Sequence, residues 1–356
     1  MSPRRGPVGV GIVGLGRSGW DLHAKTLASM PHLYTVAGVT DPIAGRCAEA
    51  ADRFGCRSFP SAGDLAAADD VELVVLATPS HLHAKTAIEV LDRGTHVLVE
   101  KPFATSLSEV DAVLDAARRA GRIATASQNL RYTADFLKVR EVVDSGHLGR
   151  LVEIKVHWHA FRRRWDWQTM RCYGGGTVNN DASHVLDQAL VLLGDHEPAV
   201  WAHLTHTPLC LGDAEDHAKI VLSGPGMPLV DLEFSNACAY PQNRWLVLGT
   251  RGALTGGPAG LRWRYVDSGS MRDRQVRSEP NPDRAYDNEE LRWTEQSCDL
   301  AEETYAESHV RMYRELYLTV REGRPLAITP DSVRRQVALL ERCRAAETRQ
   351  MEGDPQ

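Results

Sequence analysis

Residues 8–19 read VGVGIVGLGRSG, and this stretch decides the fold. A short apolar run, typical of a buried strand, passes directly into Gly14-Leu15-Gly16-Arg17-Ser18-Gly19 and then into a helix-compatible segment. Gly14 permits a tight turn, Gly16 lets the backbone approach a pyrophosphate, and Gly19 lets the helix pack closely on the strand. The helix start then offers free N–H groups and a positive dipole end to a phosphate. The motif predicts a dinucleotide-binding unit; the alternative is a glycine-rich turn without a ligand.

A second apolar segment, 34–40, strengthens the first interpretation. It ends in Asp41, 22 positions after Gly19, where dinucleotide-binding units carry the acidic residue that contacts the adenosine ribose. A carboxylate there accepts hydrogen bonds from the ribose hydroxyls and repels a 2′-phosphate. We therefore expect NAD rather than NADP, although Asp41-Pro42 is also a common turn signal.

Size and composition point to a soluble two-domain enzyme. The chain has 356 residues, 43% hydrophobic and 25% charged, with a formal charge of −6. This length exceeds one usual core, and the negative charge offers no field for nucleic acid. No stretch reaches the ~20 apolar residues of a membrane helix. The seven cysteines contain no C-x-x-C pair, so reduced thiols in a cytoplasmic protein are expected.

The first part of the chain alternates strands with helices, which predicts a parallel sheet with right-handed crossovers. The apolar run at 71–77 has the character of a strand buried on both faces. It delivers TPSHLH (78–83) to the sheet edge where ligands bind, and the strand at 96–99 delivers Glu100-Lys101-Pro102. Helices are predicted over 20–30, 43–54, 84–93 and 108–119, and a last strand over 122–127. We therefore place an NAD-binding Rossmann domain at residues 1–127.

The remaining residues, 128–356, predict a substrate-binding and oligomerisation domain of α+β type with a large, mostly antiparallel open sheet. Strands with period-two or β-branched character are predicted over 152–161, 200–207, 218–222, 229–234, 245–249 and 261–266. One helix, 177–193, interrupts them. A long surface loop is expected over 267–290, and a final amphipathic helix over 330–349 can return to the first domain.

Lys101 is the strongest catalytic candidate. It follows a buried strand at the ligand edge and precedes a proline, so its backbone is restricted. A lysine titrates near ~10.4, but burial beside a positively charged nicotinamide lowers that pKa toward the range of a working base. The alternative is a surface lysine paired with Glu100.

His184 is the second candidate, because an imidazole can relay protons near neutral pH. It shares one face of the predicted helix with Asn180, Asp181, Asp187 and Gln188, directly after three consecutive glycines, 174–176. The alternative is a solvated polar face. Asp181 and His184 have side chains that can bind a metal ion, but no third ligand occurs at a spacing typical of metal sites, so no metal is expected.

Three further features have less direct interpretations. His81 and His83 are expected to shape the nicotinamide pocket rather than to catalyse, and His23 to be structural. Arg162-Arg163-Arg164-Trp165-Asp166-Trp167 could be a nucleic-acid patch, but in an acidic chain it fits better with gripping sugar hydroxyls or lining a subunit contact.

GLGRSG, Asp41, ATPSHLH, EKP and GGGTVNNDASHVLDQAL occur in this order, and with them the chain resembles the glucose–fructose oxidoreductase, inositol dehydrogenase and MocA family from about residue 8 to 340. The resemblance implies a Rossmann domain followed by a domain whose open sheet makes dimer or tetramer contacts. It also implies dehydrogenation of a pyranoside or cyclitol. By position, Lys101 matches the family lysine, His184 the family histidine, and Asp187 the later aspartate.

One position departs from the family pattern. Four residues before the histidine the family usually has aspartate, whereas this chain has Asn180 with Asp181 beside it. Asparagine can hold a substrate hydroxyl but cannot act as a base, so more of the proton transfer should fall on Lys101 and His184. Whether Asp181 faces the site is open, because one residue turns ~100° about a helix.

The sequence therefore predicts an NAD-dependent oxidoreductase that oxidises a secondary alcohol of a sugar, sugar derivative or inositol. The alternatives are an NAD-using glycosidase of the same fold and a non-catalytic NAD-binding sensor. The expected partners are a small carbohydrate or cyclitol and further copies in a homodimer or homotetramer. The catalytic candidates are Lys101, His184, Asn180 and Asp181; substrate is expected at Lys101, Arg131, Trp165, Asn180 and His184. The cofactor-binding candidates are Gly14, Leu15, Gly16, Arg17, Ser18, Gly19, Asp41, Thr78, Pro79, His81, His83, Glu100 and Lys101.

Overall fold

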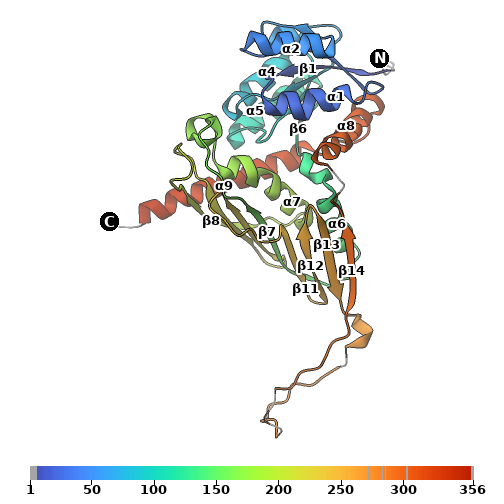
Figure 1. Cartoon of the computed structure of the whole chain (residues 1–356), viewed down its shortest axis with the longest axis vertical. Helices are drawn as coiled ribbons and strands as arrows, with labels where there is room; N and C mark the ends of the chain where they lie inside the picture. The colour runs from blue at the N-terminus through green and yellow to red at the C-terminus, as the bar shows by residue number, and fades with distance from the viewer. Residues whose placement is uncertain (1–5, 272, 283, 285, 302–303, 354–356) are drawn as a thin grey trace.

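The computed structural model describes residues 6–271, 273–282, 284, 286–301 and 304–353. The outer limits of the two predicted domains, 1–5 and 354–356, lie outside these residues, as do positions 272, 283 and 285 of the predicted loop. Figure 1 shows two layered bodies, one above the other, with a long extension below the second.

The predicted parallel sheet is confirmed. Within the described residues it has six strands in the order β3-β2-β1-β4-β5-β6, all parallel. Because β1 lies between β2 and β4, the strand order reverses there, and ligands of such sheets bind at the carboxyl ends of the strands beside that point. The strands are β1 (Val8–Val13), β2 (Tyr34–Thr40), β3 (Arg57–Ser58), β4 (Leu73–Leu76), β5 (His96–Val99) and β6 (Ala124–Ala126).

Helices cover this sheet on its two sides. Their starts and ends follow local chemistry: Ser106 and Glu109 form a capping box at the start of α5, and Gly121 ends it in the left-handed region. The helix predicted at 20–30 begins as a π-helical segment, η1 (Ser18–Ala24), before α1 (Lys25–Ala28). The others are α2 (Ala44–Phe54), α3 (Ala62–Ala66), α4 (His83–Asp92) and α5 (Leu107–Ala120).

The large, mostly antiparallel sheet is also confirmed. In the described part of the chain it has eight strands in the order β14-β13-β12-β11-β7-β10-β9-β8, and only β7 and β10 pair in parallel. Alternate residues of each strand face the helices, as Ala218, Ile220 and Leu222 do in β9. The strands are β7 (Leu151–His159), β8 (Ala199–Thr205), β9 (His217–Ser223), β10 (Leu229–Ser235), β11 (Trp245–Gly249), β12 (Gly252–Gly257), β13 (Gly260–Tyr265) and β14 (Thr294–Asp299).

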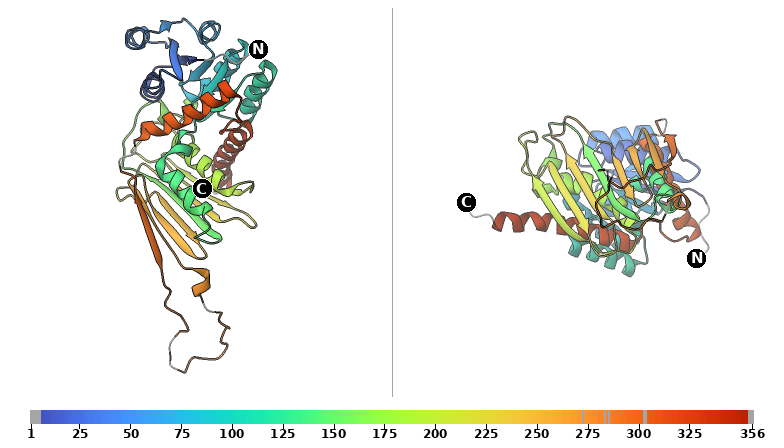
Figure 2. Two further views of the ribbon diagram at one scale, coloured as in Figure 1. Left: turned by 90° about the vertical axis from the view of Figure 1, so that its right-hand side faces the viewer. Right: turned by 90° about the horizontal axis from the view of Figure 1, so that it is seen from below.

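Helices line one face of this sheet and leave the other face open (Figure 2). They are α6 (Ala134–Asp144), α7 (Ser183–Leu193) with the π-helical segment η6 (Val178–Ala182) before it, and part of α9 (Pro330–Gly353). The helix predicted at 177–193 corresponds to η6 and α7, the α-helix that interrupts the described strands of this sheet, whereas α6, which lies before β7, was not predicted. The extension below the sheet runs between β13 and β14 and contains the predicted surface loop.

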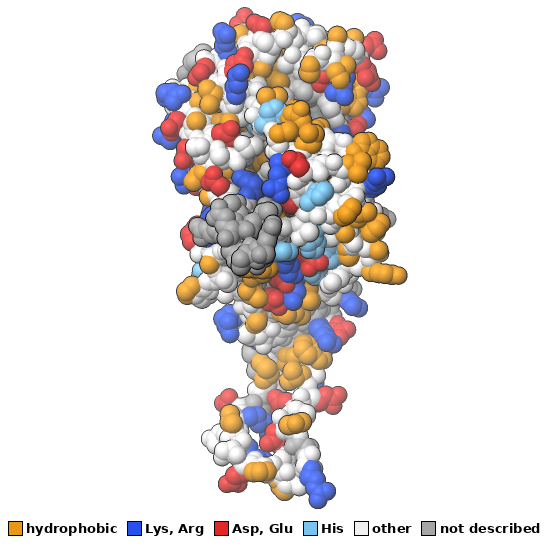
Figure 3. Space-filling model, turned by 90° about the vertical axis from the view of Figure 1, so that its left-hand side faces the viewer, with side chains coloured by type: hydrophobic (Ala, Val, Ile, Leu, Met, Phe, Trp, Pro, Cys, Tyr) orange, Lys and Arg blue, Asp and Glu red, His pale blue; other side chains and the backbone are white. Residues whose placement is uncertain are grey.

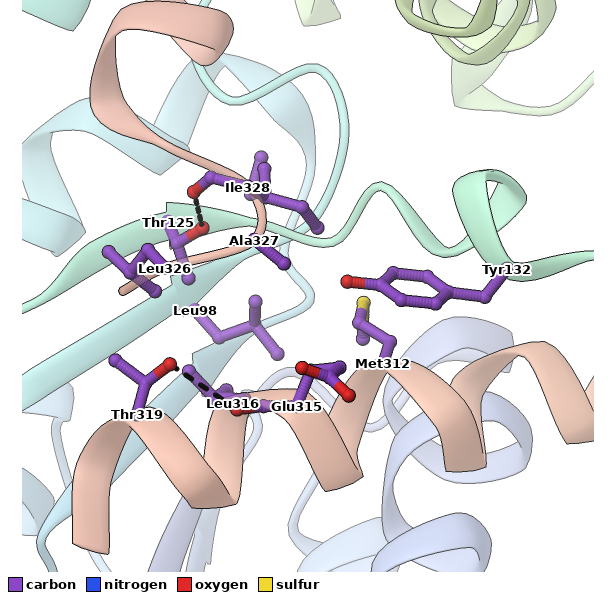
Figure 4. Close-up of a pocket in the computed structure, with 11 residues that line it drawn as sticks. Leu98, Thr125, Tyr132, Met312, Glu315, Leu316, Thr319, Leu326, Ala327 and Ile328 are labelled. Carbon is purple, nitrogen blue, oxygen red and sulfur yellow. Dashed lines mark hydrogen bonds between the residues drawn. The ribbon is translucent and has the colours of Figure 1, made fainter. Parts of the chain in front are cut away.

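The end of the chain returns to the first body. α8 (Tyr305–Glu322) packs on the parallel sheet, and Tyr34 Oη donates to the Tyr313 carbonyl at 2.7 Å. Figure 4 shows a small pocket at this seam, with Thr125 Oγ1 donating to the Ile328 carbonyl at 2.8 Å. None of the predicted site residues lines this pocket, so we assign it to helix packing. α9 continues from α5 and β6 to α7 and β8, which places it on both bodies.

Candidate active site

The three glycines of the β1–η1 turn have different surroundings. A Cβ on Gly14, whose φ is +91°, would lie 2.6 Å from the Ala77 carbonyl oxygen, and one on Gly19 would lie 1.8 Å from the Gly14 carbonyl oxygen. A Cβ on Gly16 would meet no atom within 4 Å. The fold itself therefore requires Gly14 and Gly19, whereas Gly16 borders open space of the kind that a phosphate group needs.

Asp41 is held against this turn. Its Oδ2 accepts from the Leu15 N–H at 2.7 Å, and its Oδ1 accepts from the Ile43 N–H at 2.8 Å. Arg46 lies 3.5 Å from the same carboxylate. Arg17 is exposed beside the turn, and Ser18 is half-buried. The Asp41 carboxylate is thus fixed beside the turn, with a cation next to it.

Residues after β4 line the next part of the sheet edge. The His83 ring is buried between the Pro102 and Thr78 carbonyls, with each ring nitrogen 2.8 Å from one oxygen, so it fixes these two chain segments. Thr78 Oγ1 is buried and has no partner among the described residues, which leaves it available to a ligand. After Pro79, the His81 ring lies 5.2 Å from that of Tyr173 in the second body.

Lys101 joins the two bodies. Its Nζ donates to the Asn180 carbonyl oxygen at 2.9 Å. Burial lowers the pKa of Lys101 below its usual value, against the opposing charges of Glu100 and Asp181, and Arg164 and Arg17 lower it further. The alternative of a surface lysine that pairs with Glu100 does not fit this placement.

Glu100 faces the other way. Its Oε1 lies 2.9 Å from His23 Nε2, and His23 Nδ1 lies 2.6 Å from Tyr313 Oη. Burial would raise the pKa of Glu100, but the hydrogen bond and charge of His23, with the charge of Lys101, hold it well below its usual value. Glu100 is therefore an anion directly behind Lys101, and His23 has the structural position expected of it.

The polar face of the 177–193 segment is not solvated. His184 is 6% exposed, and Asn180, Asp187 and Gln188 are similarly buried. No described residue pairs with His184 Nδ1. Burial, followed by the charge of Lys101, lowers the pKa of His184 well below 6.5. His184 is therefore a neutral imidazole with one free nitrogen, beside a lysine.

Asn180 and Asp181 are both near Lys101, by different routes. Asn180 contacts it through the backbone carbonyl, while its side-chain amide donates to the Gln168 carbonyl at 3.3 Å. Asp181 accepts from Thr177 Oγ1 at 3.1 Å, and its charge raises the pKa of Lys101. Asp181 therefore acts on Lys101 through its charge, and the Asn180 side chain supports the loop.

Arg131 and Trp165, expected at the substrate, are placed differently. The Arg131 guanidinium forms a bidentate pair with Asp187, at 2.6 Å and 2.5 Å, and also donates to Ala327 and Ser332. These contacts fasten α7 to the start of α9 and to the segment before it, so this geometry gives Arg131 a structural role. Trp165 is 72% exposed on the loop between β7 and η6.

The Arg131–Asp187 pair provides a stability prediction. Arg131→Met should lower the free energy of unfolding by about 3–5 kcal/mol, because it leaves the Asp187 carboxylate buried and uncompensated. Chemical denaturation would measure this, with the exposed Arg140→Met as the control. A variant with unchanged stability but a raised KM would instead place Arg131 at the substrate.

Residues of α8, and one residue directly before β11, were not predicted as site residues. Tyr305, His309 and Tyr313 recur at four-residue spacing, which is a helical signal that went unused. His309 is 1% exposed with no described partner at Nε2, and burial lowers its pKa to about 4. Arg244, before β11, lies over the Trp158 ring. No local pattern marks Arg244 as a site residue.

Two features of the described residues bear on other classes of function. They contain no group of three or more His, Cys, Asp or Glu side chains that could hold a metal ion. They also contain no helix both long and apolar enough to cross a membrane.

The chain matches known proteins over both bodies. Residues 8–128 match the family described as "Oxidoreductase family, NAD-binding Rossmann fold", and residues 136–255 match the "GFO/IDH/MocA C-terminal domain". Inositol 2-dehydrogenase 2 of Saccharopolyspora erythraea is 29% identical over 291 residues, covering 80% of this chain and 83% of that protein. The 2,7-anhydro-N-acetylneuraminate hydratase of Escherichia coli is 25% identical over 253 residues, covering 69% and 67%.

Solved structures agree on the fold. The NAD-binding protein from Listeria innocua gives a TM-score of 0.78 at 23% identity, covering 96% of this chain and 95% of that one. Levoglucosan dehydrogenase, solved in complex with NADH and levoglucosan, gives 0.77 at 19% identity, covering 96% and 98%. The two family matches together span more than half of the sequence. The chain therefore belongs to the GFO/IDH/MocA oxidoreductase family, with an NAD-binding Rossmann domain as its first body.

Proposed function

We propose that this protein is an NAD-dependent dehydrogenase that oxidises a secondary alcohol of a sugar, sugar derivative or inositol to the ketone. The observation that carries the proposal is the placement of Lys101. Its amine lies at the ligand edge of the parallel sheet, 2.9 Å from the Asn180 carbonyl oxygen, next to a helix that presents the free nitrogen of His184. Inositol 2-dehydrogenase 2 is a relative whose name states a reaction of this class.

The nucleotide site fits a dinucleotide on three counts. Gly16 borders open space, the Asp41 carboxylate is fixed beside the turn, and Thr78 Oγ1 is buried without a described partner. The chemistry that NAD supplies when bound is acceptance of a hydride from the substrate carbon. Asp41 favours NAD, since it would repel a 2′-phosphate. The residues proposed to hold it are Gly14, Leu15, Gly16, Arg17, Ser18, Gly19, Asp41, Thr78, Pro79, His81, His83, Glu100 and Lys101.

Lys101 is the proposed base. It must be neutral to accept the hydroxyl proton, and burial lowers its pKa in the direction that this requires. The Asn180 carbonyl accepts one of its N–H bonds and so directs the amine. Glu100, held as an anion by His23, stabilises the protonated lysine after the transfer.

His184 is proposed to orient the hydroxyl and to relay the proton. As a neutral imidazole it offers Nδ1 to the substrate without adding a positive charge. The charge of Asp181 acts on Lys101, and its half-buried carboxylate can accept a hydrogen bond from a second hydroxyl. This differs from the role expected for Asn180, whose side-chain amide bonds the Gln168 carbonyl.

A panel of inositols, aldoses and glycosides, assayed for NADH and NADPH formation, tests the proposed function. At least one compound should reduce NAD, with a kcat/KM higher than with NADP. Product formation without accumulation of NADH would move the protein to the oxidation–elimination–reduction class. Absence of turnover over the whole panel would favour a non-catalytic NAD-binding protein.

We also propose that the chain forms a homodimer or homotetramer through the open face of the eight-stranded sheet. Figure 3 shows histidine, basic and acidic side chains gathered on the side of the molecule that bears β8. On the open face, Lys219 bridges Asp231 at 2.6 Å and Glu233 at 3.1 Å, and Trp201 is 49% exposed. Light scattering should give a multiple of 39.3 kDa. A monomer at micromolar concentration would contradict this.

A further inference from the structure

Arg244 lies directly before β11, at the end of the sheet nearest the candidate active site. Its Cζ is 3.7 Å from the centroid of the Trp158 ring on β7, and its carbonyl accepts from the His157 N–H at 2.9 Å. The stack on Trp158 fixes the plane of the guanidinium, and the hydrogen bond to the Arg244 carbonyl fixes the backbone from which the side chain extends. The N–H groups along the edge of the guanidinium are therefore preorganised.

The charges of Asp135 and Asp181 raise the pKa of this guanidinium, against the larger effect of burial. Among the described residues, no carboxylate forms an ion pair or a hydrogen bond with it. The neighbouring acids are engaged elsewhere: Asp135 accepts from Trp245 Nε1 at 3.0 Å, and Asp181 accepts from Thr177 Oγ1 at 3.1 Å. Arg244 is half-buried, and burial lowers its pKa. Such a cation costs free energy unless a ligand compensates it.

Arg244 shares the electrostatic environment of the catalytic candidates. Its charge lowers the pKa of His184, after burial and the charge of Lys101, and Asp181 raises the pKa of Arg244. The topology agrees, because β7 pairs with β10, which packs against η6, and η6 contains Asn180 and Asp181. Arg244 therefore belongs to the second-body side of the site, across from the nucleotide-binding edge.

The acidic residues near the site are paired with other residues. Glu100 is paired with His23, and Asp181 lies 3.7 Å from Arg162. The charges of Lys101 and Arg244 both lower the pKa of His184, and no described carboxylate forms an ion pair with Arg244. A neutral sugar would leave that guanidinium unpaired, whereas a carboxylate would accept two of its N–H bonds in one plane.

We propose that Arg244 binds a carboxylate of the substrate, so that the preferred substrate is an acidic sugar, such as a hexuronate, or an acidic cyclitol derivative. This inference rests on the proposed function, because it names the substrate class of the same site. Trp158 supports the guanidinium from one side, and the carboxylate meets its free edge. Arg244 then fixes the distance of the reacting hydroxyl from Lys101.

Binding measurements test the proposal without turnover. Titration calorimetry on the full chain with saturating NAD should show glucuronate or galacturonate binding at least about tenfold more tightly than glucose or galactose, as expected for a charge-assisted bidentate contact. Arg244→Gln should remove this preference, so that each acid binds no more tightly than its parent sugar. Arg244→Lys, which keeps the charge but not the planar fork, should retain part of it. Arg262→Gln, an exposed arginine on β13, is the matched control.

Equal affinity for acid and parent sugar in the unaltered protein would overturn the proposal, and so would a preference that survives Arg244→Gln. The first comparison needs no variant, so a poorly folded Arg244→Gln does not block the test. The proposed function fails separately. If the protein binds hexuronates but forms no NADH, the assignment of Arg244 stands and the proposed function fails. If it oxidises neutral sugars with no preference for acids, the proposed function stands and the assignment of Arg244 fails.

Discussion

Lys101→Met should reduce kcat by about 10²–10⁴-fold, the usual contribution of a positioned general base, with a much smaller loss of affinity for NAD, which the other proposed residues still hold. The methionine keeps most of the apolar stem but removes the amine that donates to Asn180. The control is Lys85→Met, an exposed lysine on α4. Single-turnover kinetics with a substrate found in the panel would measure the loss. Unchanged turnover would remove Lys101 as the base.

The same variant should not be unstable. The folded pKa of Lys101 is lower than its unfolded value, so the folded state binds the proton less tightly, and at neutral pH the charge costs stability. The contribution of Lys101 to the free energy of unfolding therefore rises as the pH rises from its folded pKa to its unfolded pKa. Removing the charge should leave the melting temperature equal or higher, which separates loss of catalysis from loss of folding.

Substitutions of two glycines in the β1–η1 turn should have different effects, one on folding and the other on cofactor binding. Gly19→Ala places a Cβ 1.8 Å from the Gly14 carbonyl oxygen and should destabilise the fold by more than about 3 kcal/mol. Gly16→Ala adds a Cβ where no protein atom lies within 4 Å. This variant should fold normally and bind NAD at least about tenfold more weakly, because its methyl group takes the space of the pyrophosphate.

Calorimetric titration with NAD and thermal unfolding would measure both effects. Gly269→Ala, in the extension beyond β13, places a Cβ in ordinary contact with the Asp267 carboxylate, at 3.9 Å and 4.0 Å, and is the control for the substitution itself. If Gly16→Ala bound NAD with unchanged affinity, the pyrophosphate would not lie at this turn.

The sequence predicted the first body well because its signals are local. Continuous apolar strands, glycines at the turn and Asp41 each have a direct backbone or burial reason, and the strand at 96–99 has the predicted bounds. β12 was missed because Gly252, Gly256 and Gly257 mask its pattern, and β14 because its residues are polar and exposed. Propensity is weak where neighbouring strands supply the pairing.

A site residue could be predicted from the sequence only where its place on, or directly after, a single strand or helix indicates its role. Lys101 and His184 lie on predicted elements, and the structure brings them into one environment. Arg131 shows the opposite case, because nothing local indicates that its fork is occupied by Asp187, 56 residues away. Arg244 was missed for the same reason. Its stack on Trp158 depends on the pairing of β7 with β11, which no single segment encodes.

The pH dependence of kcat/KM tests the role of Lys101 most directly. Because the free enzyme must hold this lysine neutral, kcat/KM should rise with pH to a plateau, following one ionisation whose midpoint lies below the ordinary lysine value of ~10.4. The residual activity of Lys101→Met should lack that rise. A flat profile in the unaltered protein, or the same rise in Lys101→Met, would contradict the assignment of Lys101 as the base.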